Sequence, residues 1–379
     1  MKKILIIIGT RPEAIKIAPI IKELKNNKNF FSFKVCATGQ HKKMLKQALN
    51  FFNIVPDFNI NVMKKNQRLE ELTSKILIGV SKVLEKYHPD MVIVHGDTTT
   101  TLAASLAAYY KKIDICHIES GLRTQNIYSP WPEEINRKLT SHLAKFHFSP
   151  TINSKKNLIL ENINSKYIKV TGNTVLDSLL FTKKIILSSD LIKKKLDKKF
   201  FYLDYSKKII LVTGHRRENF GAQFKNILKA LKYIADKNKD ILIIYPVHLN
   251  PKILIPVKKI LNKIPNIFLV KPEDYLSFVY LMSRAYIIVT DSGGIQEEAP
   301  SLGKPVLVIR NTTERPEGVK AGNAKLVGTN TKSIIKNIED LLFYKKNYLK
   351  MCKTHNPYGN GDAGKKIIEH LKSLFIKSY

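Results

Sequence analysis

The sequence predicts an α/β fold made of two Rossmann-like domains that face each other across a central cleft. Short apolar segments alternate with segments of helical periodicity, which is the order of a doubly wound parallel sheet. The length of 379 residues suits two domains of ordinary size. The pattern Lys-Lys-Ile-x-x-x-x-Gly-x-Arg-x-Glu at residues 2–13 recurs at 207–218, so a second domain begins afresh in mid-chain.

We expect the N-terminal domain at residues 1–172 and the C-terminal domain at residues 173–363. A final helix at about residues 364–379 is expected to pack back on the first domain, by analogy with other folds of this architecture. Ligands of open α/β sheets bind at the carboxyl ends of the strands. The site is therefore expected in the cleft between the two domains.

The first domain begins with a predicted buried strand at residues 4–8. The sequence Thr-Arg-Pro-Glu at 10–13 then matches a capping box, and apolar residues at helical spacing follow it. Arg11 and Lys16 therefore lie near a helix N-terminus at the carboxyl end of a strand. The spacing of a Walker phosphate loop is missing here, so a different ligand contact is expected.

The remaining strands follow from short apolar segments that end in glycine or polar residues. In the first domain we predict a helix at 69–87 and strands at residues 33–37, 91–95, 113–119 and 146–149. After a lysine-rich connection, the second domain has predicted strands at residues 241–245, 267–270, 287–290 and 305–309.

The second domain carries a pattern that predicts a phosphate cradle. An apolar strand ends in Asp291, and Ser292-Gly293-Gly294 leads into a helix predicted to begin near Ile295. Adjacent glycines let the backbone approach a ligand, and a helix N-terminus offers free N–H groups. Glu298, about one turn into that helix, is placed to bind two ribose hydroxyls. The structural alternative is a plain strand-to-helix turn.

Four polar residues at strand ends are candidates for general acid and base. They are Asp97, Glu119 and Glu133 in the first domain and His215 in the second. Asp97 would otherwise cap a helix, and Glu133 would otherwise favour a helix dipole. Glu119 ends a buried strand, where carboxylates seldom lie for structural reasons alone.

The composition argues against several other functions. The formal net charge is +33, but the lysines are spread along the chain and no nucleic-acid-binding motif appears, so we expect no nucleic-acid partner. No apolar segment approaches the ~18 residues of a membrane span, and we expect no membrane association. The three cysteines form no C-x-x-C pair, which indicates a reducing cytoplasm.

Metal and nicotinamide chemistry are not expected either. The pairs His95/Asp97 and His117/Glu119 each share one face of a strand, yet no zinc or facial-triad signature accompanies them. The G-x-G-x-x-G fingerprint is absent from the turns that end the strands. We therefore expect no cofactor.

Six motifs resemble those of the non-hydrolysing bacterial UDP-N-acetylglucosamine 2-epimerases, and the likeness runs nearly end to end. They are GTRPEAIK at 9–16, HGDTT at 95–99, HIESGLR at 117–123, PEEINR at 132–137, TGHRREN at 213–219 and TDSGGIQEE at 290–298. The resemblance implies a glycosyltransferase-B-like fold and reversible conversion of UDP-GlcNAc into UDP-ManNAc without metal or nicotinamide. It also implies a cytoplasmic homodimer that serves surface-polysaccharide biosynthesis.

The resemblance implies a mechanism as well. The C2 proton of the sugar is not acidic, so C2 cannot be inverted by simple removal and return of this proton. UDP would instead leave C1 as the C2 proton is removed, giving 2-acetamidoglucal, and would add back while C2 is reprotonated from the other face. The catalytic set would be Asp97, Glu119, Glu133 and His215.

By the same resemblance, the C-terminal domain would bind UDP. The substrate-binding residues would be Arg11, Lys16, Glu273, Phe278, Ser292, Gly293, Gly294, Glu298 and Arg315. Phe278 would contact the uracil. Glu273 stands where some members carry a glutamine. A glutamate there can accept a hydrogen bond from the uracil N–H but cannot donate one. Gln40 and His41 fall in a region where some members bind an activating UDP-GlcNAc, although Lys43 and Asn66 differ there.

Three other enzymes stay open from the sequence. One is a sister epimerase that acts on a modified UDP-sugar. Another is a hydrolysing epimerase that releases free ManNAc. The third is a retaining glycosyltransferase on the same fold, which would need an acceptor.

Overall fold

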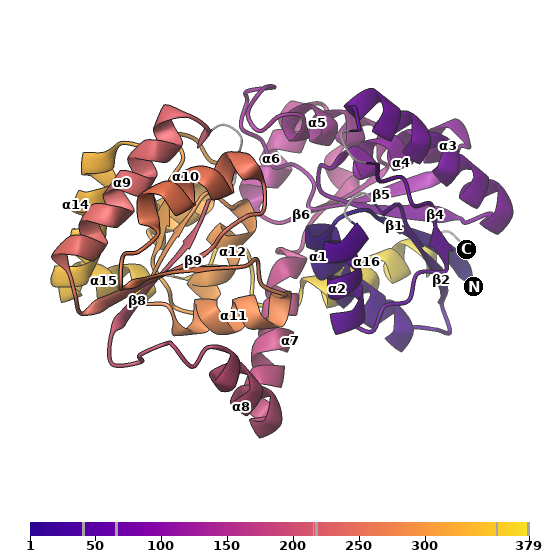
Figure 1. Cartoon of the computed structure of the whole chain (residues 1–379). Helices are drawn as coiled ribbons and strands as arrows, with labels where there is room; N and C mark the ends of the chain where they lie inside the picture. Colours follow the sequence, from indigo (N-terminus) through magenta and orange to yellow (C-terminus); the bar gives the residue numbers. More distant parts are fainter. Residues whose placement is uncertain (40–41, 65–66, 215, 217–218, 354, 377–379) are drawn as a thin grey trace. The chain divides into compact units, whose positions relative to one another are not determined.

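The computed structural model describes residues 1–39, 42–64, 67–214, 216, 219–353 and 355–376. The chain forms two compact units: unit 1 is Met1–Ser178 with Tyr358–Tyr379, and unit 2 is Leu179–Pro357. Each unit holds one parallel sheet with helices packed on it (Figure 1). The predicted α/β fold of two Rossmann-like domains is confirmed.

The sheet of unit 1 has seven strands in the order β3-β2-β1-β4-β5-β6-β7. Their bounds are β1 Lys2–Ile8, β2 Phe31–Ala37, β3 Phe58–Asn59, β4 Met91–His95, β5 Asp114–Ile118, β6 Phe146–Ser149 and β7 Ile168–Val170. The order of the strands reverses between β1 and β4. The loops that follow these two strands therefore lie together at the topological switch point, where ligands of such sheets bind.

Helices cover the sheet of unit 1 because each buries an apolar stripe against it. They are α1 Arg11–Asn26, α2 Lys42–Phe51, α3 Leu69–Tyr87, α4 Thr99–Tyr110, α5 Glu133–Leu143, α6 Ile152–Leu160 and the first turn of α7 Thr174–Ser188, with a short 3-10 helix at Ser165–Tyr167. The small residues of α4, among them Ala103 and Ala107, are fully buried and let it pack closely on α3.

The last helix, α16 (Ala363–Ile376), packs on α1 of unit 1 (Figure 1). A Cβ atom on Gly364 would lie 3.0 Å from Pro19 Cβ, so a glycine suits the contact. The Phe375 ring meets Phe31 of β2 edge to face at 6.1 Å. The chain therefore ends in the same unit in which it begins.

The sheet of unit 2 has six strands in the order β10-β9-β8-β11-β12-β13. Their bounds are β8 Lys208–Thr213, β9 Ile241–Pro246, β10 Ile267–Val270, β11 Ile287–Thr290, β12 Val306–Val308 and β13 Ala324–Leu326. Its helices are α8 Asp190–Lys199, α9 Ala222–Lys237, α10 Pro251–Leu261, α11 Tyr275–Arg284, α12 Gly293–Ser301, α13 Pro316–Ala321, α14 Thr331–Phe343 and α15 Lys345–Cys352. The switch point falls between β8 and β11, whose final residues are joined by a Thr213–Thr290 hydroxyl contact of 2.6 Å.

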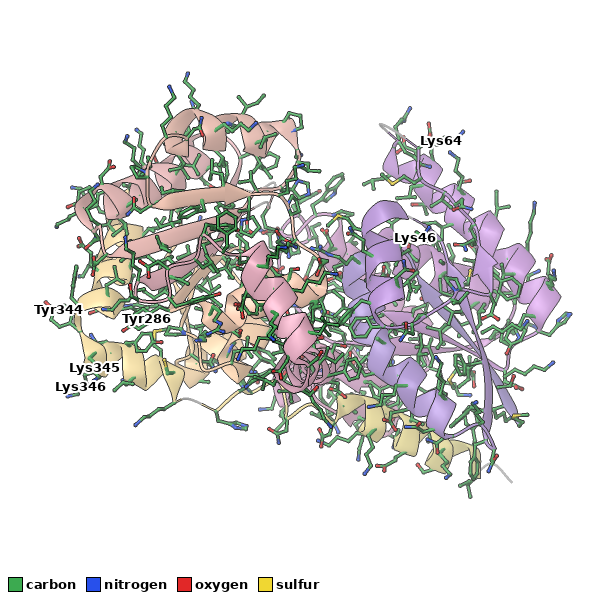
Figure 2. The ribbon with its side chains drawn as sticks, turned by 60° about the horizontal axis from the view of Figure 1, so that its bottom comes forward. Lys46, Lys64, Tyr286, Tyr344, Lys345 and Lys346 are labelled. Carbon is green, nitrogen blue, oxygen red and sulfur yellow. The ribbon has the colours of Figure 1, made fainter. Side chains whose placement is uncertain are left out.

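Lysines that contribute to the high net charge are exposed on both units. Lys46 and Lys64 are exposed on unit 1, and Lys345 and Lys346 are exposed on α15 of unit 2 (Figure 2). Among the residues that the structure describes, no helix combines the length and the apolar character needed to cross a membrane.

Candidate functional site

The switch point of unit 1 is fastened by a buried glutamate. Glu13 Oε2 accepts from the backbone N–H groups of Gly9 at 3.0 Å and Thr10 at 2.7 Å, which confirms the predicted capping box. Glu13 Oε1 accepts from the hydroxyl of Thr98 at 2.8 Å, just before α4. Burial raises the pKa of Glu13. The loop after β1, which carries Arg11 as the first residue of α1, is thus tied to the loop after β4.

Asp97 lies in the loop after β4 and is held by α5. Arg137 Nη2 donates to Asp97 Oδ2 at 2.5 Å, and Asn136 Nδ2 donates to the Asp97 carbonyl at 3.0 Å. The Arg137 side chain is only 4% exposed and also pairs with buried Glu134 at 3.2 Å. The N-cap of α4 is Thr98, so the alternative that Asp97 caps the helix is wrong.

Glu119 follows β5 and is the centre of a buried polar cluster. Its Oε2 atom accepts from Lys16 Nζ and from Asn173 Nδ2, the latter at 2.6 Å, and lies 3.8 Å from His95 Nε2. Burial lowers the pKa of His95 to about 4, so this imidazole is neutral. Glu119 has a φ of +61°, a left-handed conformation that non-glycine residues rarely adopt. Such conformations cluster at functional sites.

Asp97 and Glu119 follow the neighbouring strands β4 and β5. A Cβ atom on Gly96 would be 3.8 Å from Glu119 Oε1, and His95 feels the charges of both carboxylates. His117 Nε2 contacts the Gly96 carbonyl at 2.7 Å and so supports the same loop. Unit 1 therefore gathers two carboxylates at the ends of neighbouring strands.

Glu133 is the first residue of α5, the helix that also supplies the two contacts to Asp97. Its position is at the positive end of the helix dipole, which agrees with the alternative that Glu133 stabilises the helix. The adjacent Glu134 is fully buried and accepts from the backbone N–H of Thr124 at 3.0 Å. Glu134 thus fastens the preceding loop to α5.

In unit 2 the predicted cradle lies at the start of α12. Ser292 is the N-cap and the helix begins at Gly293, two residues before the predicted start at Ile295. A Cβ atom on Gly293 would overlap the Arg315 guanidinium and lie 2.9 Å from Glu314 Oε1. Position 293 therefore requires a glycine, because a side chain there would clash with Arg315. Gly294 differs, because a Cβ there would meet only Glu298 Oε2 at 3.9 Å.

Arg315 belongs to a buried network of arginines and glutamates that the sequence did not predict. Its Nε donates to Glu297 Oε1 at 2.6 Å, and its Nη1 donates to Glu314 Oε1. Arg310, which is fully buried, donates to the other Glu314 oxygen at 2.8 Å. The network holds the Arg315 guanidinium against the first turn of α12.

Glu298 and the residues of α11 form a second group in unit 2. The Tyr275 hydroxyl donates to Glu298 Oε1 at 2.7 Å, and burial raises the pKa of Tyr275 well above its ordinary value. Phe278 is one turn further along α11. Glu273 precedes the helix and pairs with Lys199 of α8, whose Nζ also donates to Ser277 Oγ at 2.9 Å. Lys199 was not predicted.

The loop that carries His215 is anchored on both sides. Asp291, fully buried after β11, accepts from the Arg216 backbone N–H at 2.8 Å. The Tyr245 hydroxyl donates to the Gly214 carbonyl at 3.0 Å. His215 itself lies outside the described residues.

The two residues of the predicted activator region, Gln40 and His41, also lie outside the described residues. Among the residues that are described, no group of three or more His, Cys, Asp or Glu side chains is arranged to hold a metal ion.

The fold and the two groups of side chains define the class of protein. Two doubly wound units, one with carboxylates at its switch point and one with a glycine-started helix, make a glycosyltransferase-B-like protein.

Comparison with known proteins gives the family within that class. A family model described as UDP-N-acetylglucosamine 2-epimerase matches residues 22–372. The UDP-N-acetylglucosamine 2-epimerase of Escherichia coli K12 is 53% identical over 371 residues, 98% of each chain. The crystal structure of UDP-GlcNAc 2-epimerase from Neisseria meningitidis bound to UDP-GlcNAc has 51% identity and a TM-score of 0.95, covering 97% of this chain and 99% of its own.

A more distant structure agrees. The Methanocaldococcus jannaschii UDP-GlcNAc 2-epimerase in complex with UDP-GlcNAc and UDP is 36% identical with a TM-score of 0.86, over 98% of this chain and 99% of its own. The chain belongs to the UDP-N-acetylglucosamine 2-epimerase family.

Proposed function

We propose that this protein reversibly converts UDP-GlcNAc into UDP-ManNAc by eliminating and re-adding UDP. The observation that carries the proposal is the pair of carboxylates in unit 1, Asp97 and Glu119, at the ends of neighbouring strands. Each pairs with a buried cation, Asp97 with Arg137 and Glu119 with Lys16. Family membership supports the substrate, since relatives bind UDP-GlcNAc.

The chemistry needs two proton-transfer groups. A base takes the C2 proton, the C–H electron pair forms the C1–C2 double bond, and the C1–O electron pair leaves with UDP. UDP then attacks C1 of the 2-acetamidoglucal while C2 takes a proton from the opposite face. The step is redox-neutral and consumes no water. Acid and base must therefore act on opposite faces of the sugar, and Asp97 and Glu119 are the proposed pair, with Glu133 and His215 completing the set.

The leaving group must be retained through the elimination. Ser292, Gly293 and Gly294 offer backbone N–H groups at the positive end of α12, which favours a diphosphate. Glu298, oriented by Tyr275, is the proposed ribose contact. The remaining proposed contacts are Phe278 and Glu273 for the uracil and Arg11, Lys16 and Arg315 for the diphosphate and sugar.

We further propose that the active form is a cytoplasmic homodimer. Large apolar side chains on α3 and α4 support a partner surface on unit 1: Ile78 is 54% exposed, Tyr109 57% and Tyr110 64%. Light scattering on a size-exclusion column tests the dimer, and a monomer mass at micromolar concentration would contradict it.

Proton NMR of a reaction with UDP-GlcNAc tests the activity. We expect a new anomeric signal of UDP-ManNAc that reaches a constant ratio from either direction. Free ManNAc together with UDP would instead identify a hydrolysing enzyme. No product from UDP-GlcNAc, but turnover of a modified UDP-sugar, would identify a sister epimerase.

A further inference from the structure

Asn173 lies where the chain leaves unit 1, and no sequence motif singled it out. It directly precedes α7, the helix that runs from unit 1 into unit 2, and the chain returns to unit 1 at Tyr358. The side chain is 3% exposed although the amide is strongly polar. A buried amide needs hydrogen-bond partners, and three of the contacts that Asn173 makes bear on its role.

Each partner belongs to a different part of unit 1. Asn173 Nδ2 donates to Glu119 Oε2 at 2.6 Å. Its Oδ1 accepts from the Val175 backbone N–H at 3.1 Å, which is the N-cap interaction of α7. Its own backbone N–H donates to the Tyr358 carbonyl at 2.8 Å. One residue thus joins the candidate catalytic carboxylate to both chain segments that connect unit 1 with unit 2.

The two connecting segments pack without room for side chains. Gly172 has a φ of +86°, and a Cβ atom there would lie 3.0 Å from the Tyr358 carbonyl oxygen. Gly359 has a φ of +115°, and its Cβ would lie 3.2 Å from Gly172 Cα. Asp177 of α7 accepts from the Gly364 N–H at 2.9 Å and so adds α16 to the same block. Movement of either segment therefore displaces Asn173.

Glu119 depends on this block for its orientation. Its left-handed backbone conformation is unfavourable for a residue with a side chain, and the surrounding contacts must offset that cost. Lys16 supplies a charge, whereas the Asn173 amide supplies a fixed, neutral donor that takes no part in proton exchange.

We propose that Asn173 is a positioning residue that orients Glu119 for proton transfer and ties that orientation to the two segments connecting the units. The inference rests on the proposed function, in which Glu119 is an acid or base. Relocation of a reacting group by about 1 Å costs up to ~10²-fold in rate, so a loss of this donor is expected to affect turnover more than binding.

Two variants separate the contact to Glu119 from the helix cap. Asn173→Ser keeps a good N-cap but is too short to reach Glu119. Asn173→Asp keeps the shape and the cap but replaces the donor by a carboxylate. Asn330→Ser is the matched control, because Asn330 caps α14 in unit 2 through the Ser333 N–H at 3.2 Å and hydrogen-bonds to no carboxylate among the residues that the structure describes.

We expect Asn173→Ser to lower kcat by ~10- to 100-fold with KM within about 2-fold. Asn173→Asp should lower kcat further and move the acidic limb of the pH–kcat profile to higher pH, because adjacent carboxylates hold a proton more tightly. Asn330→Ser should match the wild type in both. Wild-type kcat and pH profile in both Asn173 variants would overturn the proposal, whereas an inactive wild type would instead overturn the proposed function.

Hydrogen exchange tests the coupling without relying on turnover. Asn173→Asp should raise amide exchange in peptides covering residues 118–122 and in those covering 356–360, and the control should raise neither. Faster exchange in only one of the two segments would contradict the coupling.

Discussion

The two units place their charges differently, although both are doubly wound parallel sheets. In unit 1, Asp97 and Glu119 follow strands and pair with the buried cations Arg137 and Lys16, respectively. In unit 2, Arg310 and Arg315 converge on Glu314 beneath the start of α12. A carboxylate at the carboxyl end of a strand lies where ligands of such sheets bind, and it can act there as an acid or a base. An arginine held by glutamates is suited to fixing a backbone in place. This difference is the basis for proposing that unit 1 carries the proton-transfer groups and that unit 2 holds most of the nucleotide.

Removal of one carboxylate from unit 1 should have the largest effect. Asp97→Asn or Glu119→Gln is expected to lower kcat by ~10²-fold or more, because each removes a proposed proton-transfer group. UDP affinity, measured by calorimetry, should stay within about 2-fold if unit 2 holds the nucleotide. Glu85→Gln is the control, since Glu85 pairs with Lys111 in an exposed salt bridge on α3. A Glu119→Gln variant with wild-type turnover would remove Glu119 from the catalytic set.

Substitution of two neighbouring glycines in unit 2 distinguishes effects on stability from effects on UDP binding. Gly293→Ala drives a methyl group into Arg315, so we expect destabilisation by about 1–3 kcal/mol and weaker UDP binding. Gly294→Ala has space in the protein and a helical position, so stability should hold or rise slightly. UDP binding to Gly294→Ala should still weaken, by ~10-fold, if α12 cradles the diphosphate. Unchanged UDP affinity in Gly294→Ala would contradict the cradle.

Acid should destabilise unit 1 more than unit 2. Burial lowers the pKa of His95 and His147 to about 4 and that of His117 to about 3. The unfolded chain takes up these protons below about pH 6.5, so stability is full above that pH and is lost as the pH falls towards 4. Burial raises the pKa of Asp177 to about 6 and that of Glu13 above its usual value, which partly offsets this loss.

Tryptophan fluorescence follows the unfolding of unit 1, because Trp131, the single tryptophan, lies in that unit. Denaturant unfolding should show a lower free energy of unfolding at about pH 5 than at about pH 7. In His147→Gln the dependence of that free energy on pH should be weaker, by up to the contribution of one bound proton. His248→Gln is the control, since His248 is exposed in unit 2. The same acid slope in His147→Gln as in the wild type would refute the assignment to His147.

The smallest effect is expected at Glu273. Its partner Lys199 is 40% exposed, so loss of the pair should change stability by less than ~1 kcal/mol. Glu273→Gln should tighten UDP binding by a few-fold, on the order of one neutral hydrogen bond, because an amide donates as well as accepts. Lys199→Ala, which removes the same pair without adding a donor, serves as the comparison. Equal UDP affinity in both variants would show that residue 273 does not contact the base.

Local sequence patterns predicted the helices, strands and caps that depend mainly on residues close together in the sequence. The predicted helix at 69–87 and the strands at 91–95 and 267–270 match the observed bounds. The capping box at Thr10 and Glu13 is a contact within one helical turn, so it can be recognised from residues that are close together in the sequence. Strands β3 and β13 were missed because two or three residues at a sheet edge carry no periodicity.

The partners of the site residues could not be predicted in the same way. Asn173 is 54 residues from Glu119, and Arg137 is 40 residues from Asp97, so only the fold brings each pair together. Arg310 and Glu314 are four residues apart, a spacing that favours an ion pair but does not reveal burial. The helix-cap alternative for Asp97 failed because Thr98, one residue on, supplies the cap.

Epimerisation of UDP-GlcNAc in deuterated water tests the central claim most directly. Elimination and re-addition require the C2 proton to exchange with solvent, so product UDP-ManNAc should carry deuterium at C2 from the first turnover. NMR and mass spectrometry of the product measure both the position and the extent of labelling. We predict near-complete C2 deuterium in the product and none at other carbons. UDP-ManNAc that keeps the original C2 proton would contradict the mechanism.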